Sequence, residues 1–151
     1  MSQSDIRNHA LWLLGSREHS TYEMRQKLSR KGFEEDSITQ VIEDLTSLNY
    51  LSDQRFAEAF CRSKSAKPLG KQRILNELKQ KGISEEQAKQ ALSSLDVDWF
   101  ELALNLKQRK FGDAVERDYQ KKSKQMRYLL YRGFGFDEVR YAIEEDCTEQ
   151  D

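Results

Sequence analysis

A glycine that recurs three times, at intervals of about fifty residues, limits the folds open to this sequence. Gly32, Gly82 and Gly133 each follow a lysine or arginine and precede a hydrophobic residue. Hydrophobic residues lie on both sides of each glycine at spacings of three and four, which is the pattern of amphipathic helices. A glycine between two helices can adopt the left-handed conformation that ends a helix. Each copy therefore predicts a helix, a glycine turn and a second helix.

A further amphipathic stretch precedes each of these pairs, so that each copy contains three helices. The apolar positions of these leading helices are Ile6, Ala10, Leu13 and Leu14, then Phe56, Ala59 and Phe60, then Phe100, Ala103 and Leu104. Ser20 and Glu23 have the spacing of a capping box, and Asp53 and Asp98 are expected to cap the second and third leading helices.

The fold class that follows is all-α, an elongated array of three tandem three-helix repeats. We expect these repeats at residues 1–51, 52–95 and 96–151. Because a unit of this size buries little apolar surface, neighbouring repeats are expected to pack in sequence. Pro68 and Gly70 should end the leading helix of the second repeat, and Gly112 that of the third.

The charge of the chain is segregated although its formal net value is only -1. Residues 61–82 carry seven basic side chains against one acid, and residues 133–151 carry one against seven. The longest apolar run is far too short to cross a membrane, so no membrane segment is expected. Cys61 and Cys147 lie without metal-ligand spacing and are expected to be reduced thiols in the cytoplasm.

No group of residues predicts a catalytic site, a metal site or a cofactor. His9 and His19 lack cysteines or carboxylates at metal-ligand spacing and are expected at the surface. No phosphate-binding glycine loop of the Walker type occurs. The acidic residues after each glycine would serve as general acids or bases in an enzyme, but stabilisation of a helix N-terminus explains their recurrence more simply.

Basic residues recur on the helix before each glycine, whereas acidic residues follow it. Such a stripe would bind a phosphate backbone or an acidic protein, or would be a solvated face whose charges pair with one another. The expected contact residues are Lys64, Lys67, Lys71 and Arg73, then Lys107, Arg109 and Lys110 in an exposed cluster, then Lys121, Lys122, Lys124, Arg127 and Arg132. Tyr119, Tyr128 and Tyr131 lie among them and either stack on bases or pack at the edge of the core.

Three motifs in this pattern resemble those of the RecX family. They are Tyr50-Leu51-Ser52-Asp53-x-Arg55-Phe56-Ala57-x-x-Phe60, Arg73-Ile74-x-x-Glu77-Leu78-x-x-Lys81-Gly82-Ile83 and Leu129-Leu130-Tyr131-Arg132-Gly133-Phe134. The resemblance extends from about Ala10 to Ile143 and is most specific in the second repeat. One departure is Leu69-Gly70-Lys71, where family members often have an aromatic residue, glycine and proline.

The resemblance implies a regulator that binds the RecA recombinase filament on single-stranded DNA. It implies reduced ATP hydrolysis and strand exchange by RecA, with effects on DNA repair and the SOS response. It also implies that the protein is no enzyme, and we expect a monomer that contacts single-stranded DNA weakly and without sequence preference.

The alternative function is that of a helix-turn-helix transcription regulator that reads the major groove of DNA. Two features oppose it. The basic residues are spread over three repeats, and the helix after each turn, which would enter the groove, is the acidic one.

Overall fold

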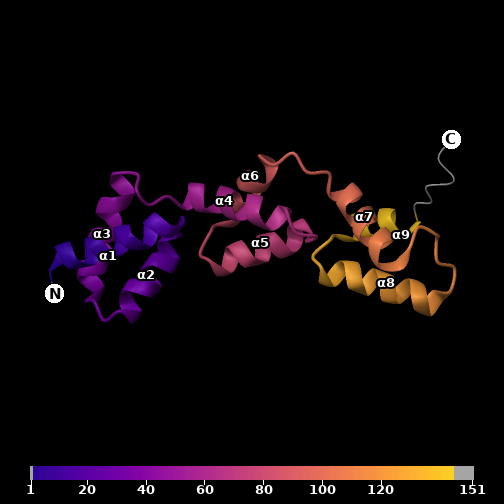
Figure 1. The fold of residues 1–151 in the computed structure, drawn as a ribbon, viewed down its shortest axis with the longest axis horizontal. Helices are drawn as coiled ribbons and strands as arrows, with labels where there is room; N and C mark the ends of the chain where they lie inside the picture. The colour runs from indigo at the N-terminus through magenta and orange to yellow at the C-terminus, as the bar shows by residue number, and fades with distance from the viewer. Residues whose placement is uncertain (1, 145–151) are drawn as a thin grey trace. The chain divides into compact units, whose positions relative to one another are not determined.

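The structure, a computed structural model, describes residues 2–144 and contains helices but no strands in that range. Its nine helices are α1 (Gln3–Ser16), α2 (Thr21–Arg30), α3 (Glu35–Ser47), α4 (Asp53–Ser65), α5 (Lys71–Gln80), α6 (Glu85–Ser93), α7 (Trp99–Phe111), α8 (Tyr119–Tyr131) and α9 (Phe136–Glu144). They follow one another along the chain in three groups of three (Figure 1). The all-α fold of three-helix repeats is therefore confirmed.

The recurring glycines end α2, α5 and α8 as the sequence predicts. Gly32, Gly82 and Gly133 have φ angles of 96°, 80° and 101°, in the left-handed region. Each turn also has the hydrogen bonds of a Schellman motif. At the first turn, Gly32 N–H donates to Ser29 O at 3.0 Å and Phe33 N–H donates to Leu28 O at 3.4 Å. The turns at residues 81–83 and 132–134 repeat both bonds.

Most of the predicted helix starts are also confirmed. Ser20 and Glu23 form a capping box at α2, and Asp98 caps α7 by accepting from two backbone amides. Asp53 is different, because Ser52 Oγ accepts the Arg55 amide at 3.2 Å and so caps α4. The prediction that Asp53 caps its own helix is wrong, and its carboxylate binds another helix instead.

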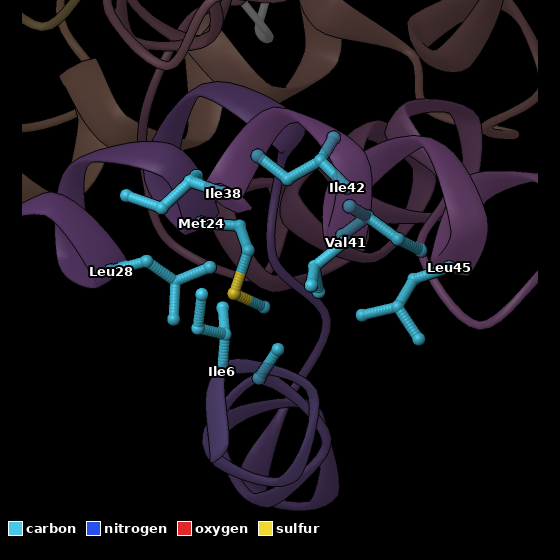
Figure 2. Packing of buried hydrophobic residues seen from close by; sticks show 9 residues of the cluster. Ile6, Met24, Leu28, Ile38, Val41, Ile42 and Leu45 are labelled. Atoms are coloured by element: carbon cyan, nitrogen blue, oxygen red, sulfur yellow. The ribbon is translucent and has the colours of Figure 1, made fainter. Parts of the chain in front are cut away.

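The first repeat closes around a core supplied by all three of its helices. Figure 2 shows Ile6 of α1 and Met24 and Leu28 of α2 pointing toward the side chains of α3. Ile6, Met24 and Leu28 are at most 1% exposed. Full burial of side chains of this size stabilises by about 1.5–3 kcal/mol each, so this cluster holds the three helices together.

The third repeat has a core of the same construction. The buried members of this cluster are Ala103, Leu104, Leu106, Leu129, Phe134, Val139, Ala142 and Ile143. They come from α7, α8, the turn after α8, and α9. Phe134, which follows the turn glycine, is 2% exposed, so the third turn is anchored in its own repeat by the residue after the glycine.

The chain divides into two compact units that do not coincide with whole repeats. One unit comprises Met1–Phe60 and Glu77–Ala91, and the other comprises Cys61–Asn76 and Leu92–Asp151. Residues of the second repeat therefore pack with the first repeat in one unit and with the third repeat in the other. The contacts that join repeats are found inside these units.

Cys61 is a buried free thiol, and burial raises its pKa to about 11. Cys147 lies outside the described residues. Within residues 2–144, no helix combines the length and the apolar character that crossing a membrane requires.

Candidate partner-binding surface

The turn at residues 81–83 packs on the first turn of α2, which joins the first and second repeats. A Cβ added to Gly82 would lie 2.5 Å from the Cβ of Tyr22, so only glycine fits this contact. Beside it, Lys81 Nζ donates to Glu23 Oε2 at 3.2 Å. A basic residue and a glycine of one repeat thus bind the start of a helix in the repeat before it.

The start of α4 binds the same end of α2. Asp53 accepts hydrogen bonds from Thr21 N at 2.8 Å and from Thr21 Oγ1 at 3.1 Å. Arg55 Nε donates to Glu18 Oε2 at 2.9 Å just before α2 begins. Asp53 therefore satisfies a backbone amide at the N-terminus of α2 that has no partner within its own helix.

Glu23 is the buried centre of this junction. Its side chain is 7% exposed and accepts hydrogen bonds from both terminal nitrogens of Arg17, at 3.1 and 3.0 Å. Burial by itself raises the pKa of Glu23. The hydrogen bonds from Arg17, the Ser20 amide and Lys81 lower it by more, so that the pKa falls to about 2. The carboxylate therefore stays ionised over the whole physiological pH range.

His19 is buried in the same region, so the expectation of a surface histidine is wrong for this residue. Lys27 Nζ lies 2.8 Å from Nε2, and Arg17 O lies 3.1 Å from Nδ1. A lysine can only donate, so Nε2 accepts and Nδ1–H donates to the carbonyl. Burial lowers the pKa of His19, although the bond to the Arg17 carbonyl opposes this, and Lys27 favours the neutral ring further.

The turn at residues 132–134 makes the equivalent contact with α5, between the third and second repeats. Gln72 N–H donates to Gly133 O at 3.0 Å, and Gly70 N–H donates to Arg132 O at 2.9 Å. A Cβ on Gly133 would lie 2.8 Å from Arg73 N, and one on Gly70 would collide with the Gly133 backbone. The glycine within Leu69-Gly70-Lys71 is thus required by this close approach.

Three of the predicted contact residues serve this junction. Lys71 Nζ lies 3.4 Å from Glu138 Oε2, and the Arg73 guanidinium lies over the ring of Tyr131, 5.7 Å from its centre. Arg132 Nε donates to Pro68 O at 3.0 Å. Their side chains are half-buried, so they hold α5 against the turn after α8.

Lys107 contradicts the expectation of an exposed basic cluster at the end of α7. It is fully buried, and its Nζ donates to Gly112 O at 2.9 Å and to Ala114 O at 2.8 Å. Its neighbours Arg109 and Lys110 are exposed, as predicted. Lys107 therefore fixes the loop after α7 and offers no charge to a partner.

We expect Lys107→Met to destabilise the protein by about 1–2 kcal/mol, because two backbone carbonyls lose their donor. The cost stays moderate because Gly112 and Ala114 are exposed, so water can replace part of the interaction. Urea unfolding followed by circular dichroism measures the change. Arg109→Met, at an exposed position of the same helix end, serves as the control and should change stability by less than about 0.5 kcal/mol.

Half of the exposed residues in the predicted set lie on α8, and the others are Lys67, Arg109 and Lys110. Lys121, Lys124 and Arg127 are exposed and lie on one side of the helix, at spacings of three. Tyr131, on the same side, is 75% exposed. We call these four residues the α8 basic face.

The other predicted aromatics differ in their surroundings. Tyr119 is 80% exposed at the start of α8. Tyr128 is half-buried against the edge of Phe111, and Lys110 Nζ lies 5.4 Å from the centre of its ring. Tyr128 therefore packs at the edge of the core. Tyr119 is exposed, whereas the ring of Tyr131 has the Arg73 guanidinium over one face although 75% of the residue is exposed.

A shallow hollow lies in the first unit between the end of α1 and the α3–α4 connection. It is lined by Leu14, Tyr50 and Arg55, among others. Arg55 is already paired with Glu18. No cluster of three potential metal ligands occurs among residues 2–144.

Comparison with known proteins identifies the same three-helix units. Models of the first, second and third three-helix domains of RecX match residues 7–45, 52–92 and 96–143. Together they extend over most of the described chain.

Curated relatives match over nearly their whole length. The chain is 42% identical to "Regulatory protein RecX" of Vibrio cholerae over 144 residues, which is 95% of each protein. It is 38% identical to the protein of the same name from Serratia proteamaculans, with 91% of this chain and 95% of the relative covered.

A solved structure has a similar fold. The crystal structure of RecX from Lactobacillus salivarius superimposes with a TM-score of 0.80 at 26% identity, covering 94% of each chain.

Proposed function

The chain belongs to the RecX family, and on that premise we propose that it is a regulator of the RecA recombinase filament on single-stranded DNA. It binds the filament, reduces ATP hydrolysis and strand exchange, and so limits recombination during DNA repair and the SOS response. The family membership carries this proposal, together with the name of its relatives as regulatory proteins. The protein acts as a cytoplasmic monomer and has no catalytic activity of its own.

The α8 basic face supports a contact with the filament. Its three basic side chains make no ion pair within residues 2–144 and are exposed, so they are available to an acidic protein surface or to phosphate groups. Attraction of this kind is weakened by salt and does not depend on base sequence. The exposed ring of Tyr119, at the start of the same helix, adds a surface on which an unpaired base stacks.

The helices after the glycine turns support the same choice over a reader of duplex DNA. α3 begins with Glu35 and Asp36, and α6 begins with Glu85 and Glu86. α9 carries Asp137 in its first turn. These acids would face the phosphates of a major groove and repel them, so a groove-reading role is disfavoured.

The decisive measurement is ATP hydrolysis by RecA on single-stranded DNA as the protein is titrated. We expect substoichiometric amounts to suppress hydrolysis, with co-sedimentation of the protein with the filaments. Unchanged hydrolysis at saturating protein would overturn the proposal.

A pair of arginine variants tests the α8 basic face. Arg127→Glu should weaken inhibition severalfold at low salt and reduce its salt dependence, because a favourable charge becomes repulsive. Arg140→Glu, an exposed arginine on α9 of the same repeat, is the matched control and should inhibit like the unchanged protein. Equal effects of the two variants would remove α8 from the contact surface but leave the regulatory function intact.

A further inference from the structure

The turn at residues 31–33 has the construction of the two junction turns, but no described part of this chain covers it. Gly32 has a φ of 96° and Gly82 one of 80°, so their backbones follow the same course. A Cβ added to Gly32 would meet no heavy atom within 4 Å, whereas one on Gly82 would strike Tyr22. We call residues 31–33, between α2 and α3 (Figure 1), the open turn.

Both covered turns bind the same kind of structure, the first turn of an α-helix. The turn with Lys81 packs on the start of α2 and forms its ion pair with Glu23, the third helical residue. The turn with Gly133 packs on the start of α5 and accepts the amide of Gln72. This turn type therefore binds helix N-termini twice within one chain.

The open turn resembles the turn at residues 81–83 in the residue before the glycine, which in that turn pairs with an acid of the bound helix. Lys31 and Lys81 both precede the glycine, whereas the third turn has Arg132. The third turn also tolerates a basic helix start because Glu138 pairs with Lys71. Ser37, five residues after Gly32, corresponds to Glu138 and has no charge to pair with a basic residue. A helix start that carries a carboxylate therefore fits the open turn better than one that carries a lysine.

The surroundings of the open turn add an apolar contact area. The ring of His9 stacks on Trp12 with centres 5.7 Å apart, and it also contacts Phe33 at 6.2 Å. Trp12 is 71% exposed. Exposed tryptophan beside a basic group is a common composition at the centre of protein interfaces. Among residues 2–144, Lys31 forms no ion pair, so its charge is available.

We infer that the open turn is a docking edge for the N-terminal turn of an α-helix on a partner protein, with an Asp or Glu among its first three residues. Lys31 pairs with that carboxylate, the backbone of Gly32 approaches the helix start closely, and Trp12 covers the flank. The inference rests on the proposed function, because it takes the RecA filament as the partner that supplies the helix.

Head-to-tail association, in which the start of α8 of a second copy occupies the open turn, is disfavoured by charge. The covered turns pack on the starts of α2 and α5, which are the second helices of their repeats. The start of α8 is the corresponding helix start in the third repeat, and Asp118 already accepts the Lys121 amide there. Lys121 and Lys122 lie in that first turn and would oppose Lys31. Charge therefore favours a different protein over head-to-tail association.

The occupant is identified by placing a photo-crosslinking amino acid at position 30 of the full-length chain, an exposed position next to Lys31, so that Lys31 itself is kept. The protein is bound to RecA filaments on single-stranded DNA, irradiated, digested and analysed by mass spectrometry. We expect the cross-link at the first turn of a RecA helix that carries an acidic residue. Cross-links to DNA, to another copy of the chain, or to a strand or loop of RecA would overturn the inference.

A charge reversal measures the contribution of the contact. Lys31→Glu should weaken filament inhibition about tenfold, because the pair becomes repulsive. Lys79→Glu is the matched control, since it is an exposed lysine at the end of α5, and should leave inhibition within about twofold. Both variants should melt like the unchanged protein.

The outcomes separate this inference from the proposed function. If the unchanged protein inhibits and Lys31→Glu inhibits equally, the docking edge is wrong and the regulatory function stands. If the unchanged protein neither binds nor inhibits filaments, both are overturned. Loss of inhibition by Lys79→Glu as well would show a general charge effect and would also overturn the docking edge.

Discussion

Gly133→Ala should destabilise the protein by about 3 kcal/mol, while Gly32→Ala should cost only about 1 kcal/mol. Both glycines have φ near 100° and end a helix with the same bonds, so both alanines carry the same conformational cost of about 1–2 kcal/mol. At Gly133, however, the new methyl group strikes the backbone and Cβ of Arg73. Overpacking of this kind adds about 1–3 kcal/mol.

The measurement uses the two tryptophans of the chain as local reporters. Trp12 lies in the first unit and Trp99 in the second. Single-tryptophan variants, unfolded in urea, report the two units separately. Gly133→Ala should lower the midpoint reported by Trp99 more than Gly32→Ala lowers that reported by Trp12.

The comparison tests the junction because both glycines have the same conformation and the same cap bonds, whereas only Gly133 lies against a neighbouring helix. Equal losses at both sites would mean that backbone conformation alone explains the glycines. In that case the packing of the third turn on α5 would contribute little to stability, and the same reasoning would weaken the open turn as a docking edge.

The glycines show which part of the structure could be read from the sequence. Their recurrence predicted the helix ends, because a left-handed cap is a local requirement. The second reason for Gly82 and Gly133, the close approach of a neighbouring repeat, involves Tyr22 and Arg73 about sixty residues away. Spacing along the chain carries no direct signal for such contacts.

The wrong predictions concern polar residues with distant or loop partners. Lys107 lies in a basic stretch that reads as solvated, but backbone carbonyls beyond the end of α7 accept its bonds. Asp53 has the spacing of a cap for α4 but binds Thr21. His19 lacks a metal-type neighbour and is buried against Lys27. In each case the residue type indicated a polar role, and only the folded chain supplied the partner.

The sequence shows that Lys31 corresponds to Lys81 and Arg132, because a basic residue precedes the glycine in each repeat. The sequence pattern could not distinguish a turn that is covered from one that is open. That distinction depends on contacts in the folded chain, because Tyr22 and Arg73 lie against Gly82 and Gly133, whereas no described residue lies against Gly32. The candidate docking edge therefore follows from comparing equivalent sites in the structure.

Glu23→Gln should destabilise the first unit by about 2 kcal/mol at pH 7 and by progressively less as the pH falls. Ionised Glu23 is bound by Arg17 and Lys81, and its folded pKa is about 2 against an ordinary value of 4.5. A depressed pKa stabilises the folded state fully above the unfolded value, and this contribution is lost as the pH falls from 4.5 toward 2. The shift corresponds to about 3 kcal/mol, which we reduce because Arg17 and Lys81 are nearly half exposed.

Urea unfolding between pH 2 and pH 7, reported by Trp12, measures this difference. Glu35→Gln is the control, since Glu35 pairs with Arg25 at 2.6 Å but lies 61% exposed. It should cost less than about 1 kcal/mol. A difference between Glu23→Gln and the unchanged protein that stays constant down to pH 2 would show that the amide disturbs packing instead. A difference that disappears in acid identifies the ionised carboxylate as the group through which Arg17, Ser20 and Lys81 stabilise the start of α2.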